Sequence, residues 1–164
     1  MNKTAPIDQK IYDPGCGIAL GEWVARFPRP LVFTNGCFDI LHRGHVSYLE
    51  QAATLGATLI IGVNSDNSVR LLAKGSERPI NAVQDRMALL AALASVDAVV
   101  CYDQATPLKL VNMIKPDHLV KGGDWPPEQI VGGKEVMSWG GKVHSLEFQF
   151  QRSTSDLINR IRCG

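Results

Sequence analysis

The sequence lacks the features that mark membrane, secreted and metal-dependent proteins. No apolar run approaches the roughly 18 residues needed to cross a bilayer. The N-terminus has no basic segment followed by an apolar stretch, so no secretory signal is predicted. The four cysteines form no C-x-x-C pair and match no zinc-ligand spacing. We therefore expect a cytoplasmic protein with reduced thiols and no protein-bound metal centre.

An excess of charge of one sign is also missing. Seventeen Lys and Arg residues oppose sixteen Asp and Glu residues, which leaves a formal net charge of +1. Such a balance gives no strong field that would favour nucleic acid or an anionic membrane as a partner. The remaining composition is that of a globular chain, with 164 residues of which 45% are hydrophobic. That is enough for one domain with a substantial core.

Strand-like apolar runs alternate with helical patterns along the chain. Strands are expected at residues 31–34, 58–63, 98–101, 118–120 and 142–146. Helices are expected at residues 44–55, 65–73, 81–94 and 106–114, and from Ser153 onward. This alternation predicts an α/β fold with a doubly wound, five-stranded parallel sheet. Ligands of such a fold bind at the C-terminal ends of the strands, where the strand order reverses. Residues 1–30 are expected to form an N-terminal arm and a short helix, ahead of the main domain at 31–164.

Several residues are expected to end or cap these helices. Gly56 is placed as a C-terminal cap, and Asn81 and Thr106 as N-terminal caps. Ser153 and Asp156 have the spacing of a capping box at the start of the last helix. The apolar residues predicted for the inner side of that helix are Leu157, Ile158 and Ile161.

The most informative stretch follows the first expected strand and reads T-N-G-C-F-D-I-L-H-R-G-H over residues 34–45. In a doubly wound fold, the start of the following helix offers free N–H groups and a dipole that favours an anion. His42 and His45 are three residues apart and can point to one side. Gly44 between them lets a ligand approach the backbone. Two imidazole donors near a phosphate could stabilise charge that grows on it.

Simpler interpretations of these residues remain open. The histidines could be ordinary surface residues at a helix start, and Gly36 could serve only as a turn residue. Asp39, His42 and His45 could instead supply three ligands to a metal ion. The position of H-R-G-H between a strand and a helix, behind T-N-G-C-F-D, favours the phosphate site.

The motif T-x-G-x-F-D followed by H-x-G-H resembles the signature of the cytidylyltransferase-like nucleotidyltransferase superfamily. The resemblance runs from Leu31 to about Arg162, and R-S-T-S at 152–155 matches a late serine/threonine cluster. F-T-N-G-C-F-D-I-L-H-R-G-H-V-S-Y-L, V-N-S-D-N-S-V, R-P-I-N and V-K-G-G-D-W resemble D-glycero-β-D-manno-heptose 1-phosphate adenylyltransferases more particularly. The resemblance implies a Rossmann-like nucleotidyltransferase domain that transfers AMP from ATP to the heptose 1-phosphate. Pyrophosphate would be released, and the product would serve lipopolysaccharide core assembly in bacteria.

The same resemblance implies roles for individual residues. Catalytic roles fall to His42, His45 and Lys74. Nucleotide and phosphate binding falls to Thr34, Asn35, Gly36, Phe38, Gly44, Arg86, Ser153, Thr154 and Ser155. Acceptor binding falls to Asp39, Lys121, Gly123 and Asp124. Mg²⁺ would enter with ATP, and the partners would be ATP and a sugar 1-phosphate within a dimer or larger homo-oligomer.

Alternatives exist for several of these roles. Lys74 could be a solvated surface lysine, Arg86 could make helix-surface ion pairs, Asp124 could order its glycine turn, and Ser153 could be only a cap. Thr54 stands where many superfamily members have a basic residue, so a phosphate contact there is absent or supplied elsewhere. The whole chain could also be a cytidylyltransferase acting on glycerol 3-phosphate or another alcohol phosphate. Two more distant alternatives are a nucleotide-binding regulator without turnover and a metal-dependent hydrolase.

Overall fold

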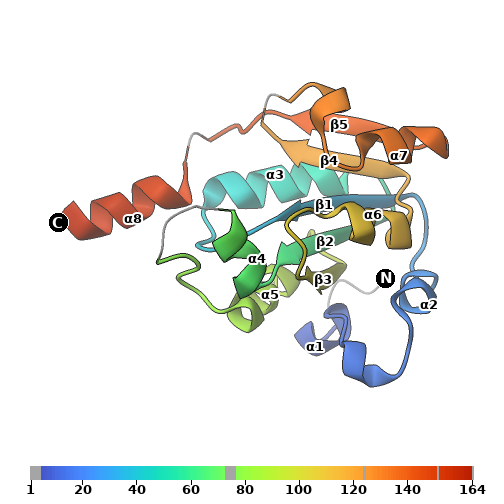
Figure 1. The fold of residues 1–164 in the computed structure, drawn as a ribbon, viewed down its shortest axis with the longest axis horizontal. Helices are drawn as coiled ribbons and strands as arrows, with labels where there is room; N and C mark the ends of the chain where they lie inside the picture. The colour runs from blue at the N-terminus through green and yellow to red at the C-terminus, as the bar shows by residue number, and fades with distance from the viewer. Residues whose placement is uncertain (1–4, 73–76, 124, 151, 164) are drawn as a thin grey trace.

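A computed structural model describes residues 5–72, 77–123, 125–150 and 152–163 and shows a five-stranded sheet flanked by helices (Figure 1). The strands are β1 (Leu31–Gly36), β2 (Thr58–Asn64), β3 (Ala98–Tyr102), β4 (His118–Gly122) and β5 (Lys142–Leu146). All are parallel, in the order β3-β2-β1-β4-β5. Every residue of β2 is buried, as its unbroken apolar run predicts. The predicted fold class is therefore confirmed.

Helices cover both faces of the sheet. They are α1 (Ile7–Lys10), α2 (Leu20–Val24), α3 (Arg43–Ala53), α4 (Asp66–Leu71), α5 (Val83–Ala91), α6 (Leu108–Ile114), α7 (Gly133–Ser138) and α8 (Thr154–Cys163), with short 3-10 turns η1 (Pro14–Cys16) and η2 (Pro127–Gln129). One apolar core joins α2, α6 and α7 to the sheet, and a second joins α3 and α5 to its other face. None of the helices in the described part of the chain is long and apolar enough to cross a membrane.

The strand order reverses between β1 and β4, which are neighbours at the centre of the sheet. The chain leaves β1 toward α3 on one face, whereas it enters β4 from α6 on the other. Helices that diverge in this way leave a crevice at the C-terminal ends of the two strands. Asn35 and Gly36 end β1 there, and Lys121 and Gly122 end β4.

The N-terminal segment packs against the sheet more closely than we expect of an N-terminal arm. The Lys10 side chain is buried, and its ammonium group donates to the Val96 carbonyl at 2.9 Å. Ile11 forms a bridge with Val99 of the edge strand β3, where the Tyr12 N–H donates to the Val99 carbonyl. The segment therefore covers the outer edge of β3, which an exposed arm would leave open.

Three of the predicted caps are wrong. Helix α3 has Thr54 at its C-cap, and Gly56 is needed for a different reason, since a Cβ there would lie 2.5 Å from the Pro30 carbonyl oxygen. Ala82, not Asn81, is the N-cap of α5, because the Asn81 amide donates to the Asp39 carbonyl at 2.6 Å. Pro107 takes the N-cap position of α6, and no side chain caps that helix.

The start of the last helix is placed correctly, but its predicted inner side is only partly covered: Leu157 and Ile158 are half-buried, whereas the prediction for Ile161 is wrong. The Asp156 N–H donates to the Ser153 hydroxyl at 3.0 Å, as a cap requires. None of the ten residues of α8 is buried, and Ile161 is 77% exposed. Figure 1 shows α8 projecting beyond the sheet and its covering helices. Its apolar spacing indicates an amphipathic helix but does not predict which part of the chain would cover its apolar side.

Candidate active site

A cavity of about 480 Å³ opens at the ends of β1 and β4. It brings together the predicted residues Asn35, Gly36, Phe38, Asp39, His42, His45, Lys121, Ser153, Thr154 and Ser155. Thr34, Gly44, Arg86 and Gly123 do not line it. The predicted residues Lys74 and Asp124 lie outside the described residues.

The two histidines form a stacked pair at the N-terminus of α3. Their ring centroids are 3.8 Å apart, with 17° between the ring planes. His42 is the N-cap residue, and its Nδ1 accepts a long hydrogen bond from the His45 N–H at 3.4 Å. A Cβ on Gly44 would lie 3.1 Å from the His42 ring and from the Phe150 carbonyl oxygen. The absent side chain at Gly44 therefore allows this close packing.

Burial keeps both imidazoles neutral near neutral pH. Desolvation, together with the charge of the neighbouring His42, lowers the pKa of His45 to about 4. Desolvation also lowers the pKa of His42, although its own backbone hydrogen bond acts in the opposite direction. The buried Nδ1 of His45 has no hydrogen-bond partner in the described part of the chain. A ligand that supplied one would remove the cost of this unsatisfied atom.

Phe38 supports this pair from an unusual backbone conformation. Its φ of 47° lies in the left-handed region, where non-glycine residues carry strain. The ring packs edge-on against His45, with centroids 5.2 Å apart. A Cβ on Gly36 would come within 3.0 Å of the Phe38 ring. The small size of Gly36 therefore leaves room for the Phe38 ring in this turn.

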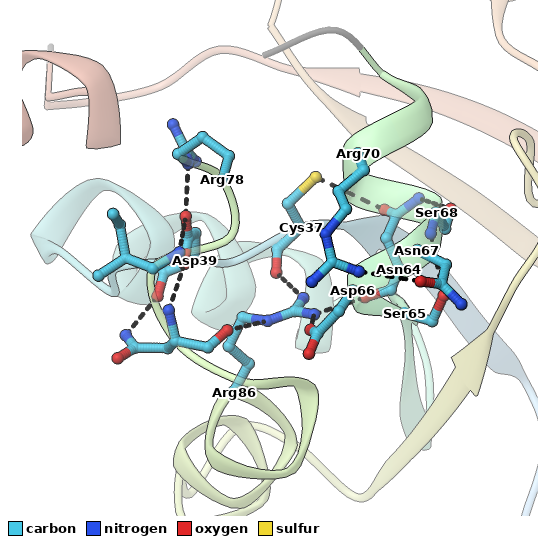
Figure 2. Close-up of polar contacts among 12 residues, drawn as sticks. Cys37, Asp39, Asn64, Ser65, Asp66, Asn67, Ser68, Arg70, Arg78 and Arg86 are labelled. Atoms are coloured by element: carbon cyan, nitrogen blue, oxygen red, sulfur yellow. Dashed lines mark hydrogen bonds and ion pairs between the residues drawn. The ribbon is translucent and has the colours of Figure 1, made fainter. Parts of the chain in front are cut away.

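Asp39 is almost fully buried and holds another loop against the cavity (Figure 2). Its carboxylate accepts from the Arg78 guanidinium, from the Ile80 N–H at 2.8 Å and from the Asn81 N–H at 2.9 Å. This arrangement brings Arg78 to the cavity wall. The carboxylate has its partners within the protein, and a direct contact with an acceptor stays a prediction.

The metal-ligand alternative gains no support from this geometry. Residues 5–72, 77–123, 125–150 and 152–163 contain no group of three His, Cys, Asp or Glu residues placed to hold a metal ion. Asp39 pairs with Arg78, whereas His42 and His45 stack on each other. The three residues of the proposed triad therefore do not converge.

Arg86 joins three segments beneath the site instead of lining it (Figure 2). Its fully buried guanidinium donates to the carbonyls of Asn81 at 3.0 Å, Cys37 at 2.6 Å and Asn64 at 2.8 Å. It also pairs with the Asp66 carboxylate at 2.8 Å. The structure gives no support to phosphate binding by Arg86, and its burial also differs from the helix-surface alternative.

Thr34 likewise uses its side chain inside the fold. Its buried hydroxyl lies 2.6 Å from the Tyr48 hydroxyl, which also donates to the Val120 carbonyl at 3.3 Å. Burial raises the pKa of Tyr48 above its ordinary value, so its hydroxyl keeps its proton. These bonds fasten α3 to β1 and β4 directly beside the histidines. Tyr48 lines the cavity and was missed from the sequence.

The serine cluster also lines the cavity, next to the loop that leads into α3. Ser153 caps α8, and the Thr154 hydroxyl donates to the Ile40 carbonyl at 3.4 Å. Arg152, immediately before the cluster, lines the same wall. Capping and a place in the cavity are therefore compatible.

Thr54 does not bear on the cavity. It is exposed at the C-cap of α3, and its hydroxyl donates to the Gln51 carbonyl at 2.7 Å. The length of α3, roughly 16 Å, separates it from the histidines.

Arg78 and Arg152, which sequence reasoning missed, supply cationic groups to the cavity wall together with Lys121. Arg78 opens the R-P-I-N segment and Arg152 precedes the serine cluster, so both adjoin recognised motifs.

The chain matches known proteins over most of its length. Residues 33–159 match the cytidylyltransferase-like family. The chain is 58% identical over 139 residues to D-beta-D-heptose 1-phosphate adenylyltransferase of Bordetella bronchiseptica, covering 85% of this chain and 86% of that protein. It is 51% identical to the bifunctional protein HldE of Haemophilus ducreyi, covering 92% of this chain and 33% of that protein. The chain thus spans about a third of this bifunctional relative.

Solved structures give the same picture of the fold. The lipopolysaccharide core biosynthesis protein from Thermoplasma volcanium superposes with a TM-score of 0.61 and 27% identity, covering 74% of this chain and 98% of that one. Pantothenate synthetase from Thermus thermophilus superposes with a TM-score of 0.53 and 16% identity, covering 76% of this chain and 58% of that one. At this identity, the second similarity shows the fold alone.

Proposed function

Because this chain belongs to the cytidylyltransferase-like family and is a nucleotidyltransferase, we propose that it transfers AMP from ATP to D-glycero-β-D-manno-heptose 1-phosphate. The products would be ADP-heptose and pyrophosphate, and ADP-heptose would serve lipopolysaccharide core biosynthesis. The observation that carries the proposal is the 58% identity to a D-beta-D-heptose 1-phosphate adenylyltransferase over 85% of the chain. The cavity adds a stacked histidine pair at a helix N-terminus, which is a favourable place for a phosphate group.

The proposed reaction is an in-line displacement at the α-phosphorus of ATP. An oxygen of the sugar phosphate forms the new P–O bond as the bond to the bridging oxygen of pyrophosphate breaks. The attacking phosphate is already a nucleophile near neutral pH, so no protein nucleophile is needed. The contribution of the protein is to position the two substrates and to stabilise the charge that develops between them.

His42 and His45 would provide that stabilisation. Their lowered pKa values leave both rings neutral at pH 7, so each ring can donate one N–H to a phosphate oxygen. The N-terminus of α3 adds its dipole to the same point. Packing and hydrogen bonds around Gly44, Phe38 and Tyr48 hold the helix in place before substrate arrives.

The leaving pyrophosphate would be bound by the serine cluster at the start of α8. Ser153, Thr154 and Ser155 stand at the N-terminus of α8, with Arg152 just before them. Hydroxyl groups, a helix dipole and a guanidinium together suit an anion with several negative charges. Lys74 is proposed as a further phosphate contact from the family resemblance alone.

Mg²⁺ would arrive with ATP and be held mainly by phosphate oxygens and water. Among the described residues that line the cavity, Asp39 is the only acidic one, and its carboxylate is engaged by Arg78 and two N–H groups. This donor set does not form a protein cage for the ion. Mg²⁺ bound with ATP would supply positive charge that neutralises charge on the leaving group.

Assembly and location are further parts of the proposal. The apolar side of α8, formed by Leu157, Ile158 and Ile161, is not buried within the described chain and supports self-association into a dimer or larger homo-oligomer. Sedimentation of the wild type should give a mass above that of the monomer, and Ile161→Glu should lower it. A cytoplasmic location is proposed because ATP is the donor.

The proposed reaction is tested by crossing ATP, CTP, GTP and UTP with heptose 1-phosphate and glycerol 3-phosphate in the presence of Mg²⁺. Pyrophosphate release is the readout. Release with ATP and the heptose phosphate alone is the expected result. Release with CTP and glycerol 3-phosphate would replace the substrates with those of a cytidylyltransferase. Nucleotide binding without release from any pair would contradict the proposal in favour of a regulator.

A further inference from the structure

A second, smaller pocket adjoins the main cavity on the α6 face of the sheet. Its volume is about 170 Å³, and it shares Asn35 and Lys121 with the main cavity. The other residues that line it are Pro107, Trp125, Gln129, Ile130 and Val131. None of these carries a negative charge, and most of the wall is apolar, in contrast to the histidines, arginines and hydroxyls of the main cavity. The two shared residues therefore separate a polar compartment from an apolar one.

Local structure holds Trp125 in this pocket. The backbone N–H of Trp125 donates to the Ser145 hydroxyl at 2.9 Å, and that hydroxyl donates in turn to the Gly123 carbonyl. Gly123 has a φ of 108°, and a Cβ there would lie 2.8 Å from the indole Nε1. Gly123, predicted as an acceptor residue, thus makes room for Trp125.

Trp125 remains 48% exposed, although its backbone is hydrogen-bonded to β5. A large aromatic side chain that contributes little to the core but lines a pocket is typical of a ligand contact.

We propose that this pocket binds the sugar ring of the acceptor, with Trp125 as the surface on which the ring packs. The inference rests on the proposed function and names the part of the site that selects the acceptor. A pyranose ring presents apolar C–H groups on its faces and hydroxyls around its rim. The C–H groups can pack on Trp125 and Ile130, and the hydroxyls can exchange hydrogen bonds with the Gln129 amide.

The position of the shared residues supports this assignment. The α-phosphorus of ATP must lie near His42 and His45 in the main cavity, and the acceptor phosphate must reach it from one side. A sugar phosphate whose phosphate group lies by Asn35 and Lys121 would extend its ring directly into the smaller pocket. The larger cavity is left for the larger substrate.

The main cavity also has an aromatic surface of its own. Phe148 lines it, is 43% exposed, and has its ring centroid 5.6 Å from that of Tyr48. Gly122 leaves room for this ring as Gly123 does for the indole. The two aromatic rings lie beside consecutive glycines at the end of β4, Phe148 in the main cavity and Trp125 in the smaller pocket, so Trp125 would serve the sugar and Phe148 the nucleotide.

The test compares Trp125→Ala, Trp125→Phe and Phe148→Ala by steady-state kinetics with each substrate varied in turn. Trp125→Ala should raise the KM for heptose 1-phosphate about tenfold and leave the KM for ATP within about twofold. Trp125→Phe should recover most of the affinity because it keeps an aromatic face. Phe148→Ala should raise the KM for ATP and leave the KM for heptose 1-phosphate nearly unchanged. A rise in the KM for ATP alone upon Trp125→Ala would overturn the inference.

A binding measurement provides a readout that does not depend on turnover. Titration of heptose 1-phosphate should change the tryptophan fluorescence of the wild type and have a much smaller effect on Trp125→Phe, which keeps Trp23 and Trp139. Equal changes in both proteins would contradict the inference. If the wild type used heptose 1-phosphate while Trp125→Ala behaved normally, this inference alone would fail. If the wild type did not use it at all, the proposed function would fail first.

Discussion

Helices α3 and α8 both present their N-termini to the same cavity, yet they are held very differently. Helix α3 buries Gly44, Tyr48, Leu49 and Ala52 against the sheet. Helix α8 has no buried residue among Thr154–Cys163, and Figure 1 shows it extending away from the sheet. Besides the wall around Ser153, an ion pair between Arg162 and Glu77 joins it to the rest of the described chain.

This difference suggests different roles for the N-termini of α3 and α8. Groups that stabilise a transition state act best when they are fixed before the substrate arrives, and the packing of α3 achieves this for the histidines. Groups that close around a substrate and release a product are drawn from less stable parts of a fold. Changes on the α3 side should therefore alter turnover or global stability, whereas changes on α8 should alter substrate affinity.

The largest expected effect is a loss of stability when the buried hydrogen bonds of Arg86 are removed. Arg86→Ala would leave three buried carbonyls and Asp66 without their partner, so the free energy of unfolding should fall by about 3–5 kcal/mol. Urea denaturation measures this change. Arg70→Ala is the matched control, since exposed Arg70 contacts Asn67 and should change stability by no more than about 0.5 kcal/mol. A stable Arg86→Ala protein that no longer binds ATP would restore phosphate binding as the role of Arg86.

His45→Ala tests whether the fixed wall carries the chemistry. Loss of one preorganised donor should lower kcat by about 10²–10³-fold, while the melting temperature changes little. Single-turnover kinetics and thermal unfolding together provide the measurement. The control is His144→Ala on β5, which removes a hydrogen-bond partner of His118 on β4 and should keep kcat near that of the wild type. Equal losses of folding and activity in His45→Ala would contradict a catalytic role.

The pH dependence of stability should report the buried His45 ring. Its pKa is lowered from 6.5 to about 4 in the folded protein, so between these values the unfolded state binds the extra proton. Stability should therefore fall as the pH falls through this window, by at most about 1.4 kcal/mol per pH unit. His42 titrates in the same direction. His45→Ala should make the slope measured by denaturation shallower, and an unchanged slope would mean that the His45 ring is not desolvated.

The smallest expected effect lies on α8. Ser153→Ala removes the cap of a helix that buries nothing, so the KM for ATP should rise about fivefold with little change in the global unfolding midpoint. Hydrogen exchange should show faster exchange within residues 154–163 alone. A loss of global stability comparable to that of Arg86→Ala would remove the distinction between the two helices.

Features set by local sequence were predicted well. The buried strands appear as apolar runs because both faces of β2 are covered. The histidine pair could be placed because its strand, turn and helix are contiguous from Leu31 to Ala53. The free N–H groups and the dipole of a helix start do not depend on distant residues.

The errors concern residues whose partners are far away in the sequence. Asn81 was expected to cap its own helix, but it bonds to Asp39, and Arg86 reaches Cys37 in the same region. Ile161 has helical spacing, which indicates an apolar face but does not show what covers it. Trp125 lies in a loop without periodicity, and only the structure places it beside Asn35.

The central claim is that the cavity joins AMP to a sugar phosphate, and the fate of the α-phosphate of ATP tests it most directly. ATP labelled at the α-phosphate should be incubated with the protein, Mg²⁺ and heptose 1-phosphate, and the labelled products separated. The label should appear in ADP-heptose, with one pyrophosphate released per labelled sugar. Label found instead in free AMP or ADP, or attached to the protein, would contradict direct transfer between the two substrates.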